Sequence, residues 1–137
     1  MTSDTRTIGG LAAELMRRFP AAWAEDWDRV GLVTGDPSAR LDGVLVTLDA
    51  TGEAVERARA SGANLVLTHH PPFIEMPQRI EAGPGPDGTL EAALRLGVAV
   101  VSLHTNLDRS PEGGDALASA LGLRVEYPLE AGTERVS

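Results

Sequence analysis

Hydrophobic positions along the chain follow two patterns, short continuous runs and helical repeats. The runs GVLVTL (43–48), NLVLT (64–68) and VAVVSL (98–103) are typical of buried strands. Between them, the stretches 51–62 and 89–97 place apolar residues three and four positions apart, which predicts amphipathic helices with Leu90, Ala93 and Leu94 facing inward. Apolar strands that alternate with such helices indicate an α/β fold, with a mostly parallel sheet and helices on both faces.

Further elements flank this repeating unit. Ile8, Leu11 and Leu15 follow helical spacing after Thr7, which is suited to cap a helix, and Pro20 ends that segment. The stretch 21–40 predicts irregular structure in which both tryptophans pack, and the stretch 81–88, rich in proline and glycine, predicts a loop. The stretch 113–123 predicts one more helix, and RVEY at 124–127 predicts a last short strand.

Length and composition fit one domain. A chain of 137 residues can bury a core, so we expect a single α/β domain over residues 1–137. The net charge of −8 argues against binding to nucleic acid or to an anionic membrane surface. The chain has no cysteine, which excludes disulfides and thiolate ligands, and no stretch reaches the length of a membrane span. We therefore expect a cytoplasmic protein.

Polar side chains follow each of the three predicted strands. Asp49 follows the first strand, His69 and His70 follow the second, and His104 and Asp108 follow the third. Ligands of open α/β sheets bind beyond the carboxyl ends of the strands, so these side chains should converge. Imidazole and carboxylate are ligands that zinc, iron and manganese accept in proteins. The sequence therefore predicts a divalent metal site at this edge, built around the histidines.

Each of these residues also has a simpler explanation. Consecutive side chains of a regular strand point to opposite faces, so we expect the histidine pair just past the strand end, where Pro71 keeps the chain extended. His104 is equally suited to a place beside the metal and to a backbone contact in the core, and Asp49 to a turn or helix cap. The motifs of phosphate loops, dinucleotide sites and zinc peptidases are absent, and no GxSxG turn places a nucleophilic serine.

Five segments resemble, in order, the N-terminal half of one known family. They are DRVGLVTGD, GVLVTLDAT, GANLVLTHHPP, VSLHTNLD and GGDALASALGL, and the likeness extends over roughly residues 8–123. The family is that of the dinuclear metal-centre proteins, also called type 2 GTP cyclohydrolase I-like proteins. The resemblance implies an α/β fold that holds two divalent ions in a cavity, and homo-oligomers that are rings built from dimers.

The resemblance also implies site residues. The family's adjacent histidine ligands correspond to His69 and His70, and its metal-bridging aspartate corresponds to Asp108. His104 corresponds to a histidine near the centre, to which we assign a catalytic role, either orienting a ligand or transferring a proton. One difference is Arg29, which stands where the family usually has asparagine.

A second difference concerns the rest of the metal site. The family's remaining ligands, a histidine and a glutamate, belong to a C-terminal half, and this sequence has no histidine after His104. Three explanations are open: the chain is truncated or split, another chain supplies the missing ligands, or the metal is bound weakly or singly. A C-terminal-half partner chain is accordingly one expected partner.

The sequence thus predicts a metal-dependent hydrolase-type domain in which two ions activate water. Its substrate would be a small molecule, and the resemblance implies a nucleotide. The alternative is a non-catalytic metal-binding, assembly or regulatory module with an incomplete half-site. A phosphoesterase with the same ligands is a third hypothesis, which differs mainly in its substrate.

Overall fold

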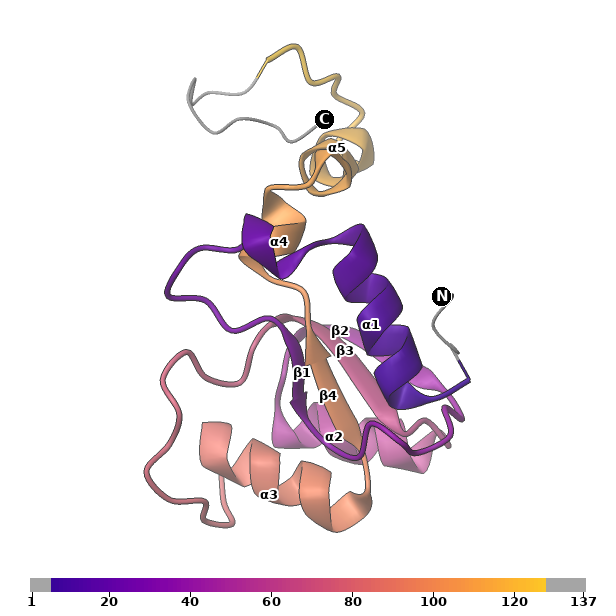
Figure 1. The fold of residues 1–137 in the computed structure, drawn as a ribbon, viewed down its shortest axis with the longest axis vertical. Coiled ribbons are helices and arrows are strands. Elements are labelled where there is room, and N and C mark those ends of the chain that lie inside the picture. Colours follow the sequence, from indigo (N-terminus) through magenta and orange to yellow (C-terminus); the bar gives the residue numbers. More distant parts are fainter. Residues whose placement is uncertain (1–5, 128–137) are drawn as a thin grey trace.

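The computed structural model describes residues 6–127, which form a four-stranded sheet with helices on both faces (Figure 1). The strands are β1 (Gly31–Thr34), β2 (Val44–Asp49), β3 (Leu65–His70) and β4 (Ala99–Ser102), in the order β1-β4-β3-β2. Strands β2, β3 and β4 are parallel, whereas β1 is antiparallel to β4. The predicted α/β class is confirmed. The sheet is mixed, because the edge strand β1 is antiparallel to the other three strands.

Strand β1 lies within the stretch for which irregular structure was predicted, and that prediction was wrong here. Gly31, the first residue of the strand, and Gly35, directly after it, have positive φ angles of 94° and 116°, a backbone conformation typical of turns. Its pairing with β4 shifts between Leu32 and Thr34. Such a short run between glycines carries little strand pattern of its own, so the pairing with β4 sets its extended conformation.

Three helices sandwich the sheet. Helix α1 (Ile8–Arg18), capped by Thr7 as predicted, covers one face, while α2 (Gly52–Ala60) and α3 (Pro86–Leu96) cover the other. The core under α1 consists of Ile8, Ala12, Leu65, Ala99 and Val101. The core under α2 and α3 consists of Val55, Ala58, Ala63, Val66, Ala92, Ala93, Val98 and Val100. Two apolar layers therefore hold the strands in place.

Some local predictions were wrong. Helix α3 begins at Pro86 inside the predicted loop, because proline at the first helical position loses no hydrogen bond. Leu94 is 58% exposed rather than inward, and Trp27 is 52% exposed rather than packed. The stretch 124–127 forms no strand.

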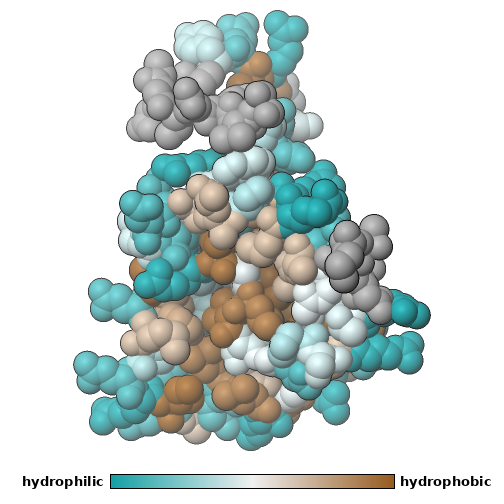
Figure 2. All heavy atoms as spheres, in the orientation of Figure 1, coloured by the Kyte–Doolittle hydropathy of each residue, from teal (hydrophilic) through white to brown (hydrophobic). Residues whose placement is uncertain are grey.

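The carboxyl end of β4 leads to α4 (Thr105–Asp108) and α5 (Pro111–Ala120), and α4 contacts the short η1 (Ala21–Trp23) that follows α1. Figure 1 shows α4 and α5 beyond this end of the sheet, with α5 standing away from the body. Figure 2 shows apolar residues gathered over the middle of the same view, with hydrophilic residues around them. In the part of the chain that the structure describes, every helix is too short or too polar to cross a membrane.

Candidate metal centre

The predicted site residues lie at one edge of the sheet. Asp49 is the last residue of β2 and is paired in register with His70, the last residue of β3. His104 follows β4 and immediately precedes α4. The histidine pair therefore belongs to the strand, and does not lie past its end as expected. Parallel strands that end together bring these side chains to one place.

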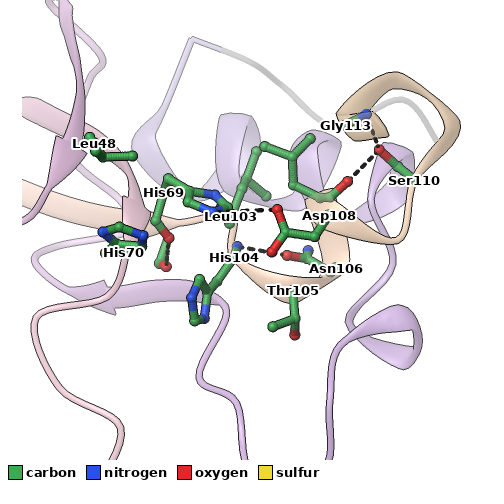
Figure 3. Close-up of polar contacts among 12 residues, drawn as sticks. Leu48, His69, His70, Leu103, His104, Thr105, Asn106, Asp108, Ser110 and Gly113 are labelled. Carbon is green, nitrogen blue, oxygen red and sulfur yellow. Dashed lines mark hydrogen bonds and ion pairs between the residues drawn. The ribbon is translucent and has the colours of Figure 1, made fainter. Parts of the chain in front are cut away.

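All three histidines of the chain come together there. The ring centroids of His69 and His70 are 5.0 Å apart, and His104 lies 5.2 Å from the first ring and 5.7 Å from the second. One ligand nitrogen from each ring lies within 4.8 Å of the other two. Figure 3 shows the three imidazoles gathered between the end of β3 and the turn of α4.

Each imidazole is held through its Nδ1 atom by an oxygen. The contacts are His69 Nδ1 to the carbonyl of Leu103 (2.8 Å), His70 Nδ1 to Asp49 Oδ1 (2.7 Å), and His104 Nδ1 to Asp28 Oδ1 (2.9 Å). Carbonyl and carboxylate oxygens accept hydrogen bonds, so each Nδ1 carries the hydrogen and each neutral ring keeps the lone pair of Nε2. Metal-binding histidines in proteins are held in this way.

Asp28 is a site residue that the sequence pattern did not identify. Its side chain has no exposed surface, and it accepts hydrogen bonds from His104 Nδ1, from the backbone N–H of Arg29 at 2.7 Å and from both the N–H and the hydroxyl of Thr105. Burial alone would raise the pKa of the Asp28 carboxyl, but the bonds from Thr105, His104 and Arg29 outweigh it and lower that pKa. The feature of the sequence that could have indicated Asp28 is that it is an acidic residue next to Trp27.

The turn that carries His104 is fixed by a second buried polar residue. Asn106 is fully buried; its amide donates to the carbonyl of Phe19 at 2.8 Å and accepts the backbone N–H of His104 at 3.0 Å. The hydroxyl of Thr105 also accepts the backbone N–H of Glu25 at 2.9 Å. These bonds tie the segment after β4 to the segment after α1, which positions His104 before any ligand arrives.

Asp108 lies beside His69 at the end of α4. Its Oδ1 atom is 3.4 Å from His69 Nε2, and its side chain is 56% exposed. Two ligands of one tetrahedral ion, each bonded at about 2.1 Å, lie about 3.4 Å apart. The separation therefore fits a histidine and a carboxylate that share one divalent ion. Asp49, expected to be a turn or capping residue, instead holds His70 in orientation.

Two clefts involve residues of the site. One, of 640 Å³, is lined by His70 and Asp49 together with the start of α2 and the loop before α3. The other, of 490 Å³, is lined by Asp28, Arg29 and Phe73 among others. Arg29 also lines the second cleft, and its guanidinium donates to the carbonyl of Asp28 at 2.9 Å. Of the two clefts, the first is the one that includes a histidine in its lining.

Comparisons with known proteins agree on one family. The profile of the family described as Duf34/NIF3 (NGG1p interacting factor 3) matches residues 7–136. A Streptomyces coelicolor protein named GTP cyclohydrolase 1 type 2 homolog is 37% identical over 112 residues, which are 81% of this chain and 39% of that protein. A Staphylococcus aureus protein of the same name is 35% identical over 118 residues, 85% of this chain and 32% of that protein.

A solved structure shows the same architecture. The crystal structure of a hypothetical protein from Staphylococcus aureus superposes with a TM-score of 0.82 at 34% sequence identity. The match covers 88% of this chain and 40% of the Staphylococcus aureus chain. The chain therefore spans well under half the length of these relatives.

Proposed function

The chain belongs to the Duf34/NIF3 family, and on that premise we propose that it is the metal-binding unit of a hydrolase-type enzyme. One observation carries this proposal. Three histidines present nitrogens to one place, and each Nδ1 is already held by an oxygen, which leaves Nε2 as the ring atom that can bind a metal ion. Metal centres built from histidine use ring nitrogens that converge on one place and whose other ring nitrogen donates to an oxygen, and this cluster has both properties.

We assign the ligand roles to His69, His70 and Asp108, with a pair of zinc, iron or manganese ions as the cofactor. The 3.4 Å separation of His69 Nε2 and Asp108 Oδ1 supports their sharing an ion, and His70 adds a nitrogen from the same strand end. When bound, a divalent ion lowers the pKa of water and provides a nucleophile near neutral pH. The names of the relatives suggest a nucleotide as the substrate and ring hydrolysis as the reaction.

His104 is the proposed proton-transfer residue. The Asp28 carboxylate fixes its tautomer with the hydrogen on Nδ1, so Nε2 is the atom that would take a proton from a reacting group. The negative charge of Asp28 also stabilises the imidazolium that would form. We therefore expect His104→Ala to keep its metal and to lose turnover, whereas loss of metal in this variant would make His104 a ligand.

The first experiment is elemental analysis of metal per chain on the purified protein after dialysis. We expect about two ions per chain in the wild type and a large loss in a variant with both His69→Ala and His70→Ala. Asp108→Asn should also reduce the metal content. Its matched control is Asp42→Asn, because the Asp42 side chain is 58% exposed and Asp108 is 56% exposed. Unchanged metal in the double histidine variant would refute the metal assignment.

A second candidate function is a non-catalytic metal-binding or assembly unit. The observation that favours it is the length of the relatives, of which this chain spans 39% and 32%. In that case the working assembly contains a partner polypeptide, or further copies of this chain, that complete the site. Turnover of GTP and of a panel of phosphomonoesters by the metal-loaded chain separates the hypotheses. Ring opening supports the cyclohydrolase reaction, phosphate release supports a phosphoesterase, and metal without turnover supports the binding unit.

A further inference from the structure

The outer strand of the sheet carries a row of apolar side chains that nothing covers in the described residues 6–127. Val44, Val46 and Leu48 alternate along β2 and are 39%, 73% and 59% exposed. Alternate side chains of a strand point to the same face of the sheet, so these three form one row, here named the β2 stripe. An exposed apolar row on an edge strand marks an interaction surface, since such edges are usually protected by charged residues.

The β2 stripe continues the core that α1 covers. Val44 is paired in register with Leu65, and Val46 with Leu67. Leu65 is fully buried in the core under α1, and Leu67 packs against that core. Paired residues share a face of the sheet, so the stripe lies on the same face as α1. The cover that α1 provides thus reaches β3 and leaves the neighbouring β2 open.

The stripe also leads directly to the candidate metal centre. Leu48, its last member, is followed by Asp49, whose carboxylate holds His70 at 2.7 Å. The backbone carbonyl of Leu48 accepts a hydrogen bond from the hydroxyl of Thr68 on β3 at 3.0 Å, which fixes this end of the strand. A polypeptide that packed along the stripe would therefore reach the strand ends at which Asp49 and His70 are paired.

We propose that the β2 stripe is the docking surface for a polypeptide equivalent to the part of the longer relatives that this chain does not span. The solved Staphylococcus aureus protein keeps the same unit at a TM-score of 0.82, and the unit is 40% of that chain. Most of that protein lies outside the unit, and burial of an exposed apolar sheet face by further polypeptide is favourable.

The charge of the chain helps to choose between occupants. A net charge of −8 on each copy opposes the pairing of two identical stripes, so a second copy is the less favoured occupant. The proposed occupant has an apolar face of its own and a less acidic surface. The inference rests on the partner polypeptide of the preceding section, and it is independent of the metal and of the reaction.

The test measures binding of the full chain to one defined probe. The probe is the part of the Staphylococcus aureus protein outside the matched unit, made as a separate polypeptide, and the matched Staphylococcus aureus unit is the positive control. The variant is Val46→Lys, which should fold because Val46 is 73% exposed; circular dichroism checks this. The matched control is Leu94→Lys on α3, because Leu94 is 58% exposed and lies on a helix that covers the opposite face.

We expect light scattering to show a one-to-one complex. Val46→Lys should lower the affinity for the probe at least about tenfold, because binding would bury an unpaired charge. Leu94→Lys should leave the affinity unchanged. Three results would overturn the proposal: no complex although the control unit binds the probe, equal binding by both variants, or self-association of the chain alone that Val46→Lys abolishes. The last result would identify a second copy as the occupant. Metal content of Val46→Lys, expected to equal that of the wild type, keeps this test separate from that of the proposed function.

Discussion

Replacement of Asp28 by asparagine tests whether one buried carboxylate organises the candidate site. The wild-type side chain accepts every hydrogen bond that it makes, from His104, Arg29 and Thr105. Asparagine keeps one accepting oxygen and replaces the other with an amide that donates. If the oxygen faces His104, the amide opposes the N–H and hydroxyl of Thr105. If the amide faces His104, it drives the imidazole to the tautomer with hydrogen on Nε2.

The expected loss of stability follows from these contacts. A hydrogen bond to a charged group contributes about 1.5–3 kcal/mol, and a buried donor left without an acceptor costs about 1–3 kcal/mol. We therefore expect Asp28→Asn to lower the free energy of unfolding by about 3 kcal/mol at pH 7. Domains of this size have about 5–15 kcal/mol of stability, so the variant should remain folded. The exposed Asp42→Asn should change the free energy of unfolding by less than about 0.5 kcal/mol.

The pH dependence has a defined sign. Folding lowers the pKa of Asp28 below its ordinary value of 3.8, so its contribution to stability is complete well above pH 3.8 and is lost as the pH falls through the lower folded pKa. Urea denaturation should show a constant difference between wild type and Asp28→Asn from pH 7 to pH 5, and a smaller difference near pH 3. Equal stability at pH 7, or a difference that grows in acid, would refute this reasoning. Nitrogen-15 NMR of His104 reports the tautomer independently.

Two further predictions concern other positions. Bound cobalt should quench the fluorescence of Trp27, because the centroid of its ring is 6.1 Å from that of His104. The quenching should persist in Trp23→Phe and disappear in Trp27→Phe. The reverse result would place the ion elsewhere. Gly35→Ala should lower the urea midpoint strongly, because φ is 116° and its Cβ would lie 2.5 Å from a side chain of β4. Gly52→Ala, with open space around it, should leave the midpoint unchanged or higher.

The sequence predicted the elements whose pattern is local. The three parallel strands are apolar runs, and the stretch 51–62, predicted to be an amphipathic helix, contains α2 with Ala54, Val55 and Ala58 buried. Strand β1 could not be predicted in this way, because its extended form depends on pairing with β4, which lies about seventy residues away. Leu94 was wrongly predicted to face inward. Helical spacing shows which residues share one side of a helix, but it does not show how much of that side the neighbouring elements cover.

The site could be predicted as far as it depends on strand ends. His69, His70 and His104 were expected at one edge because they follow predicted parallel strands, and the structure brings them together. Asp28 lies in a loop without periodic pattern, 76 positions before His104, so no spacing rule connects the two residues. The precise place of Asp108 depends on the one-turn helix α4, which is too short to leave a hydrophobic repeat.

The geometry separates the residues that fix the site from those that would bind a ligand. Asp28 and Asn106 are buried and fully hydrogen-bonded, so their replacement should lower stability first and affect the imidazoles only through position. The side chains of His70 and Asp108 are about half exposed, so their replacement should lower metal content with little change in stability. A metal-free protein should then keep its histidines in place. Binding would need little rearrangement, because the hydrogen bonds that orient the rings form during folding.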